Sequence, residues 1–181
     1  MSNLRLINET TALGGTNSVN INNVFSADYD IYKITITNAS SETQLDNNTI
    51  SLRLINSAGS TISSSNYDKA IQYMRGFSAT YLELRSTNTD NMQAIYYDIA
   101  SSNGNANATI YLFNPFLSSS YTFGIFQVAG HSSIAGQIPT AQKGIGILKQ
   151  TASMTGYSFF NRNSLNIATG TFRTYGLRVD S

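Results

Sequence analysis

Few side chains in this sequence have the spacing of a catalytic site. The carboxylates are the most relevant of them, because a pair of acidic side chains can cleave a glycosidic bond. A glycoside hydrolase holds two acids a fixed distance apart across a groove. The three glutamates, Glu9, Glu42 and Glu83, are isolated in the sequence. Asp28 and Asp30 are close together, but residues two apart on a strand point the same way, so these carboxylates would repel each other. The acidic residues that are neighbours in the sequence therefore predict no catalytic pair. A pair formed by aspartates far apart in the sequence remains an alternative.

Nucleophilic chemistry also lacks its usual residues. Cysteine is absent, and His131 is the only histidine. A serine hydrolase needs a histidine beside its nucleophile and a carboxylate, and no Gly-x-Ser-x-Gly elbow occurs in this sequence. Gly144-Ile-Gly146 is a fragment of a dinucleotide-binding fingerprint without its third glycine, and a bend or bulge in a strand explains it better. We therefore expect no enzymatic activity, no catalytic residue and no cofactor.

One segment carries ligands of the kind that Ca²⁺ prefers. Calcium takes several carboxylate and carbonyl oxygens, and Asp28 and Asp30 would supply two of them. The further acidic ligands of an EF-hand loop are missing around this pair. A turn that leads into the next strand is the favoured interpretation. We predict no metal site, with Asp28 and Asp30 as the alternative ligands.

Composition excludes two further classes of partner. The formal net charge is +1, and no cluster of Lys and Arg forms a phosphate-tracking stripe, so nucleic acid is not an expected partner. The apolar runs are only a few residues long, far short of a membrane span, and the first residues show no secretory signal. Charged residues make up 12% of the chain, about half of ordinary usage, while Ser, Thr and Asn are abundant.

The elements that would position any site are predicted to be strands. Apolar and polar residues alternate over 32–37, 49–54, 81–85 and 106–113. Runs of β-branched and aromatic residues predict buried strands over 121–129 and 145–149, with further strands over 158–160, 165–167 and 171–179. No alternation of strands with helices indicates a parallel sheet. The predicted fold is all-β: a single-domain antiparallel β-sandwich, jelly-roll-like, with about eight to ten strands.

Three segments are harder to assign. Residues 66–75 carry apolar side chains at a helical spacing, and a short helix or an irregular strand both fit. Asn103-Gly104-Asn105 predicts a hairpin turn between a strand over 94–99 and the strand over 106–113. The segment 130–144 has the longest stretch without a clear period and is predicted to be an irregular connection.

The chain is predicted to divide into a short N-terminal part and one domain. Residues 1–18 are expected to be a short strand followed by a mobile arm, and residues 19–181 the β-sandwich domain. An arm of this kind docks on a neighbour by adding a strand to its sheet or by wrapping it. Leu4 and Leu6 are the apolar residues of this arm that we expect to contact a partner.

Aromatic residues supply the other candidate partner contacts. Phe159 and Phe160 are adjacent, so on a regular strand they face opposite sides, and one of them needs a second buried surface. Aromatic rings mostly fill cores, but they also anchor interfaces. The aromatic residues that we expect to touch a partner are Phe113, Phe116, Tyr157 and Phe160.

Several motifs resemble a module found in virion structural proteins of marine bacteriophages, including tail-fibre proteins of the cyanophage type. Phe25-Ser-Ala-Asp-Tyr-Asp-Ile-Tyr-Lys-Ile34 is similar to the opening of that module. Ser51-Leu-Arg-Leu54 resembles its next strand, and Ser64-Ser-Asn-Tyr67 the Ser-x-Tyr that follows. Gly170-Thr-Phe-Arg-Thr-Tyr-Gly-Leu177 resembles its closing strand. The resemblance implies a β-sandwich used for assembly or surface display, with no cofactor and no catalytic residues.

The resulting expectation is a non-enzymatic bacteriophage virion structural protein, located in the virion and associated with the tail as a fibre or knob component. A decoration or cement protein on the head exterior is the alternative, and a module that binds host glycan is the second alternative. The expected partners are other virion proteins and further copies of the chain, for which a trimer would suit a fibre. Host surface glycan is a further candidate partner.

Overall fold

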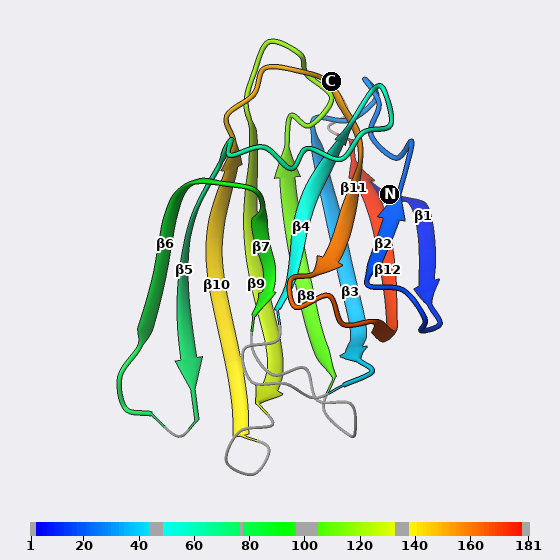
Figure 1. Ribbon diagram of the computed structural model, residues 1–181. Coiled ribbons are helices and arrows are strands. Elements are labelled where there is room, and N and C mark those ends of the chain that lie inside the picture. The colour runs from blue at the N-terminus through cyan, green and yellow to red at the C-terminus, as the bar shows by residue number, and fades with distance from the viewer. Residues whose placement is uncertain (1–2, 44–48, 77, 97–104, 133–137, 179–181) are drawn as a thin grey trace.

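The computed structural model describes residues 3–43, 49–76, 78–96, 105–132 and 138–178, and all regular secondary structure in these ranges is β-strand (Figure 1). The predicted all-β class is confirmed. The described ranges contain twelve strands, more than the eight to ten expected. The strands are β1 (Leu4–Ala12), β2 (Ser18–Ile21), β3 (Ile31–Ser41), β4 (Thr49–Asn56), β5 (Tyr67–Arg75), β6 (Leu82–Thr89), β7 (Met92–Tyr96), β8 (Ala106–Phe113), β9 (Thr122–Ser132), β10 (Ile138–Leu148), β11 (Met154–Asn161) and β12 (Ile167–Leu177).

The strands form two antiparallel sheets that face each other. The eight-stranded sheet has the order β1-β12-β3-β8-β9-β10-β5-β6, and the four-stranded sheet has the order β2-β11-β4-β7. Figure 1 shows the smaller sheet lying in front of the larger one. Pairings are nested, because β3 pairs with β8, β4 with β7 and β5 with β6. Strand pairs that are nested in this way and divided between two facing sheets are the arrangement of a jelly roll. The predicted jelly-roll-like β-sandwich is therefore confirmed.

The core lies between the two sheets and follows from strand alternation. Tyr32, Ile34 and Ile36 alternate along β3 and are fully buried. Phe159 of the smaller sheet stacks on Phe172 of the larger one, with ring centroids 5.3 Å apart. Each such side chain contributes about 1.5–3 kcal/mol by leaving water. The chain has no disulfide, so this apolar layer and the strand hydrogen bonds hold the fold together.

Glycines let the two sheets approach at one point. A Cβ added to Gly146 of β10 would lie 2.8 Å from the ring of Phe126 and 3.0 Å from the side chain of Met92, which comes from the facing sheet. Gly124 of β9 borders the same side chains. The Gly144-Ile-Gly146 motif therefore serves strand packing.

The helix considered for residues 66–75 is replaced by β5. Tyr67, Ile71 and Tyr73 point inward and are buried, which is the period of a strand. β5 pairs with both β10 and β6, so its backbone groups are bonded on both sides. The apolar residues of this segment also fit a helical spacing. Pairing with the neighbouring strands selects the strand over the helix.

The hairpin expected between residues 94–99 and 106–113 is not formed. β7 pairs with β4 in the smaller sheet, whereas β8 lies between β3 and β9 in the larger sheet. The chain crosses from one sheet to the other here, and the turn residues 103–104 lie outside the described residues. Most of the segment 130–144 also forms strand, because β9 and β10 extend into it from both sides.

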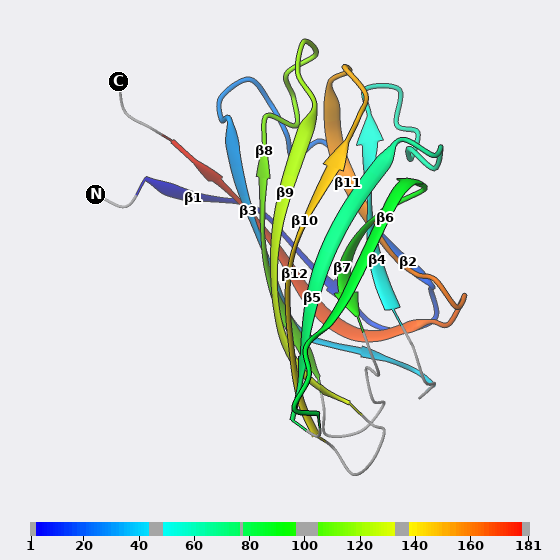
Figure 2. The same cartoon turned by 90° about the vertical axis from the view of Figure 1, so that its left-hand side faces the viewer.

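The N-terminal segment belongs to the larger sheet. β1 pairs with β12 from Leu4 to Ala12, with one bulge between Leu6 and Asn8. Figure 2 shows β1 and β12 side by side, with the two chain ends leaving on the same side. Beyond β1, Glu42 Oε1 accepts a hydrogen bond from the Gly15 amide at 2.6 Å, and β2 begins at Ser18. The expected N-terminal strand is therefore present as β1, and it continues to Ala12, into the segment predicted to be a mobile arm.

Candidate assembly surface

Side chains on the outer face of the eight-stranded sheet are ordered in rows across the strands. Directly paired residues of neighbouring antiparallel strands point to the same face, so the register defines each row. The first row crosses all eight strands and contains Leu6, Tyr175, Lys33, Tyr111, Ile125, Ile145, Ala70 and Arg85. The second row contains Leu4, Leu177, Ile31, Phe113, Phe123, Ile147 and Asp68.

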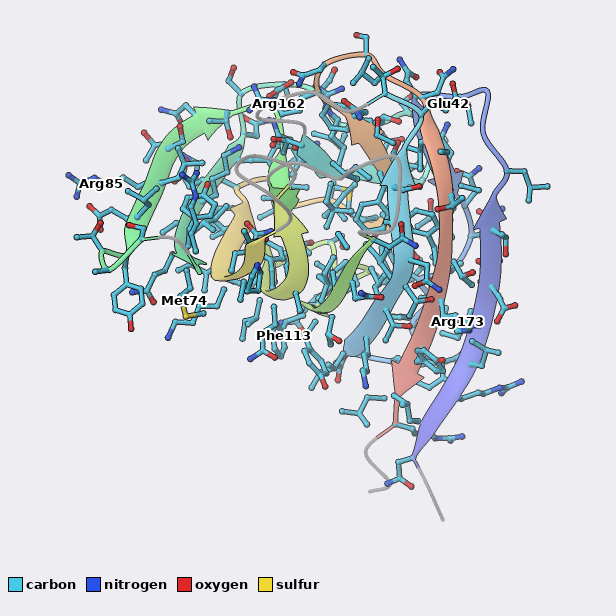
Figure 3. The ribbon with its side chains drawn as sticks, turned by 90° about the horizontal axis from the view of Figure 1, so that it is seen from below. Glu42, Met74, Arg85, Phe113, Arg162 and Arg173 are labelled. Atoms are coloured by element: carbon cyan, nitrogen blue, oxygen red, sulfur yellow. The ribbon has the colours of Figure 1, made fainter. Side chains whose placement is uncertain are left out.

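A third row is polar and bounds the other two. It contains Glu9, Arg173, Thr35, Thr109, Gln127, Lys143, Gln72 and Glu83. The outer face is therefore mostly apolar along the first two rows and polar along the third. Figure 3 looks along the strands and shows Met74 and Phe113 pointing away from the four-stranded sheet.

The centre of the two apolar rows forms an exposed surface that we call the apolar patch. It consists of Tyr111, Phe113, Phe123, Ile125, Ile145 and Ile147. Ile145 is 60% exposed, Phe123 47% and Ile125 44%. At roughly 200 Å² for each large side chain, the patch exposes on the order of 400 Å² of apolar surface. The largest apolar patch of a soluble monomer is commonly of this size, and such a patch is often functional.

Strands β8, β9 and β10 position this patch because they are apolar on both faces. On β9, Phe126 and Val128 point inward and are buried, while Phe123 and Ile125 point outward. The smaller sheet covers the inward face. No described element covers the outward face. Antiparallel sheets often leave one face uncovered, but such a face is commonly polar, whereas this one is apolar.

A groove lies beside the patch, toward β6. Ala70 is small and sits in the first row between Ile145 and Arg85, which leaves a hollow between these longer side chains. Two adjoining hollows of about 740 Å³ each meet at these residues. One extends along Phe113 and Phe123. The other extends to Tyr81, Gln72, Glu83 and Lys143.

Charged residues stand around the patch, and none of its six residues is charged. Asp68 ends the second row, and its carboxylate lies 2.9 Å from the Lys149 ammonium. The hydrogen bond from Lys149, together with one from the Asn88 amide, holds the pKa of Asp68 below its usual value. On the polar row, Arg173 pairs with Glu9 at 2.6 Å. A partner seated on the patch would therefore bury apolar groups and leave these ion pairs at the rim.

Three of the six residues predicted to contact a partner lie on this face. Leu4 and Leu6 on β1 and Phe113 on β8 belong to the two apolar rows. Leu6 is 49% exposed, whereas Leu4 and Phe113 are partly covered by their neighbours.

The other three predicted contacts lie elsewhere. Tyr157 is fully buried, and its hydroxyl forms a 2.6 Å hydrogen bond with Thr174, so it is a core residue of this chain and not a surface contact. Phe116 packs against the core from the connection between β8 and β9. Phe160 lies on the outer face of the smaller sheet with the Arg53 guanidinium 4.0 Å from its ring centroid.

The sequence reasoning missed the exposed residues of β9 and β10. Both segments were predicted to be buried strands because their residues are apolar without alternation. That signal correctly indicates two apolar faces, yet only one face has a covering sheet within the described residues. The unalternated run was therefore the sign of a strand with two apolar faces, one of which no described sheet covers.

The residues considered for metal binding and catalysis form no site in the part of the chain that the structure describes. Asp28 and Asp30 are exposed, and the Asp28 carboxylate accepts a hydrogen bond from the Ser26 hydroxyl at 3.1 Å. Among the described residues, no three His, Asp or Glu side chains gather where they could hold a metal ion. The backbone of His131 lies in β9, and its side chain falls outside the described part.

Comparisons with known proteins give no family for the chain. No protein-family model and no curated protein matches it. Among solved structures, it is similar to one titled "Structure of infectious bursal disease virus Gx strain", with 10% sequence identity and a TM-score of 0.17. The match covers 97% of this chain and 41% of that chain, so this chain spans about two fifths of its length. A TM-score of this size carries no argument about fold or function. No helix in the described residues has the length and apolar character to cross a membrane.

Proposed function

We propose that this chain is a non-enzymatic structural protein of a bacteriophage virion, associated with the tail as a fibre or knob component. In this proposal, copies of the chain join through the apolar patch on the outer face of the eight-stranded sheet. The exposed patch is the observation that carries the proposal. An exposed apolar surface favours association in water, which suits an assembly protein.

A second copy of the same chain is the proposed occupant of the patch. An isologous contact places the same surface on both sides, so its centre must be uncharged or self-complementary, and all six patch residues are uncharged. A standard interface buries about 800 Å² per partner. The patch supplies about half of that, and the outer parts of the two rows extend it across β3, β12 and β1 through Leu4, Leu6, Ile31 and Leu177, with Lys33 as their one charged residue.

The virion assignment is supported by the resemblance of four segments to the phage virion module. Residues of these segments occupy positions that hold the fold together. Tyr32 accepts a hydrogen bond from the Ser26 amide at 2.7 Å and donates one to its carbonyl at 3.0 Å. Tyr67 likewise bonds the Leu54 amide and the Ile62 carbonyl. These motif residues shape the framework of the fold. The resemblance therefore concerns mainly the framework of the sandwich.

Antibody labelling of intact particles of the phage that encodes the chain, viewed by electron microscopy, tests the proposal. Label on the tail or its fibres is the expected result. Label spread over the head would replace the tail assignment with that of a head decoration protein. The absence of label from particles, with the protein present in the infected lysate, would contradict the virion assignment.

A host-glycan-binding function is the second candidate, and one observation favours it. In the groove beside the patch, Tyr81 is 69% exposed and adjoins the polar side chains of Gln72, Glu83 and Lys143. An aromatic ring next to hydrogen-bonding groups suits the apolar and polar faces of a sugar. A glycan array probed with the purified chain and with Tyr81→Ala distinguishes the two functions. Binding that is lost in the variant would favour glycan recognition, and an empty array favours assembly alone.

A further inference from the structure

A buried lysine and a buried asparagine meet between the two sheets. Lys69 lies on β5 of the larger sheet, points inward and is 6% exposed. Its ammonium donates a hydrogen bond to Asn91 Oδ1 at 2.9 Å. Asn91 is fully buried and stands directly before β7 of the smaller sheet. A buried lysine is uncommon, and here it donates its hydrogen bond to an uncharged amide.

The side-chain amide of Asn91 is held from both ends. Its nitrogen donates to Asp90 Oδ1 at 2.6 Å, while its oxygen accepts from Lys69. Only this orientation of the amide satisfies both contacts, because a carboxylate accepts and an ammonium donates. Asp90 is fixed in turn by Arg53, which pairs with its carboxylate and donates from Nε to its backbone carbonyl at 2.9 Å.

The environment raises the share of neutral amine on Lys69. Burial, helped by the nearby charge of Arg162 and opposed by that of Asp90, lowers the pKa of Lys69 to about 8. With that pKa, about one tenth of Lys69 is neutral at pH 7, far more than for a lysine in water. A neutral amine is a nucleophile, and an ammonium is not.

We propose that Lys69 and Asn91 join in an intramolecular amide bond, a covalent cross-link between the two sheets. The Lys69 Nζ lone pair attacks Asn91 Cγ, forming a C–N bond and a tetrahedral oxyanion. The bond between Cγ and Nδ2 then breaks, and Nδ2 leaves as ammonia with its two hydrogens and one proton taken from Nζ. Starting from the ammonium, the products are the amide and one ammonium ion, so no oxidant or other reactant is needed.

Asp90 is placed to move the proton in this reaction. Its carboxylate already contacts Nδ2, the atom that must be protonated to leave. Burial acts to raise the pKa of Asp90, but the hydrogen bonds from Asn91 and Arg53 outweigh it and hold the pKa below its usual value. Asp90 is therefore a carboxylate that accepts a proton from Nζ and passes it to Nδ2.

The position of the pair favours bond formation over competing reactions. Lys69 is fixed in β5 and Asn91 directly before β7, so the reaction is effectively unimolecular. Burial keeps water away from Asn91 Cγ, which disfavours hydrolysis. The bond would close a loop of 22 residues in a chain without cysteine. Closing a loop of this size raises the melting temperature by roughly 10 °C.

Mass spectrometry of the purified chain tests the proposal. After incubation at about pH 8.5, where most of the amine is neutral, the intact mass is expected to be lower than the sequence mass by one ammonia. Tryptic digestion is expected to release a branched peptide that joins the Lys69 and Asn91 segments. Lys69→Arg should restore the full mass and abolish the branched peptide. Asp90→Asn should slow the loss of ammonia at least tenfold, as expected when a positioned proton carrier is removed.

The chain supplies its own matched control. Lys149 Nζ donates to Asn88 Oδ1 at 2.8 Å and lies beside Asp68, the same three residue types in an exposed setting. Lys149→Arg should leave the mass loss unchanged. A succinimide at an asparagine also loses ammonia but gives a linear peptide, so it does not count as the cross-link. A wild-type chain with its full sequence mass and no branched peptide after incubation would overturn the proposal.

Discussion

The hydroxyls of Tyr32, Tyr67 and Tyr157 are buried in the fold, and each is hydrogen-bonded within the chain. Tyr32 and Tyr67 close the connections that precede β3 and β5, and Tyr157 bonds Thr174 across the two sheets. Burial is the main cause that raises the pKa of each of the three phenols. These groups therefore stay neutral and act as donors and acceptors that fix loops to strands.

Tyr67→Phe tests the weight of one such hydroxyl. The variant keeps the buried ring but leaves the Leu54 amide and the Ile62 carbonyl without their partner. A buried unsatisfied group costs about 1–3 kcal/mol, so we expect the free energy of unfolding to fall by about that amount. Urea unfolding measures it. Tyr81→Phe, at an exposed ring, is the control and should change the stability by less than about 0.5 kcal/mol.

The sequence placed some of these residues and misplaced others for a physical reason. Alternation correctly puts Tyr32 on the same face as Ile34 and Ile36. The same alternation in β11 separates Tyr157 and Phe159 from Phe160, but it does not tell which face meets the core. Tyr157 was therefore expected at a partner surface, and the structure buries it. Lys69 and Asn91 are 22 residues apart, and no local pattern brings such a pair together.

At the scale of elements, the strands could be predicted from the sequence, but most of their pairing could not. The existence of strands over 106–113 and 121–129 was predicted from their residues. The register that aligns Tyr111, Ile125 and Ile145 in one row depends on contacts between distant segments. The sequence therefore indicated the exposed patch only through Phe113 and through the apolar runs of β9 and β10, which lack alternation.

Glu42 connects three segments of the chain through its hydrogen bonds. Its protonation should therefore affect the stability of the fold at acidic pH. It accepts hydrogen bonds from the Gly15 amide at 2.6 Å and from Asn166 at 2.8 Å, and these bonds lower its pKa in the folded state. A lowered folded pKa adds stability above the unfolded value that is lost as the pH falls through the folded one. We expect Glu42→Gln to show a shallower fall of melting temperature between about pH 5 and pH 3 than the wild type.

The control for this experiment is Glu83→Gln, a change to an exposed carboxylate on β6. It should leave the acid limb of the melting curve close to that of the wild type. Identical pH profiles for the wild type and Glu42→Gln would show that the bonds of Glu42 add nothing to folding.

The close approach of the sheets at Gly146 gives a second prediction for the elements. Gly146→Val places methyl groups where the ring of Phe126 and the side chain of Met92 already lie. Overpacking of this kind costs about 1–3 kcal/mol. Calorimetry should show a lower melting temperature for this variant. Ala129→Val, an outward-facing change on the neighbouring β9, should not lower it, and equal effects of both variants would argue against a packing role of Gly146.

For the whole molecule, the two proposals describe complementary ways to stabilise a sandwich without cysteine. The proposed amide bond would fasten the two sheets to each other from within. The proposed self-association would cover the apolar face that the fold leaves in water. Composition predicted this class of molecule well, because few charges and many Ser, Thr and Asn residues favour strands and turns over helices. The nested order of the strands is a property of the complete chain and required the structure.

Self-association through the apolar patch is the central claim, and the molar mass in solution tests it most directly. Light scattering coupled to size exclusion should give a dimer for the wild type at tens of micromolar, and a monomer for Ile145→Glu, because the variant would bury a charge without a partner. Gln127→Glu, on the polar row of the same sheet, is the matched control and should remain a dimer. A trimer that Ile145→Glu also dissociates would keep the patch as the interface with a different symmetry. A wild-type monomer, or an oligomer that Ile145→Glu leaves intact, would contradict the account.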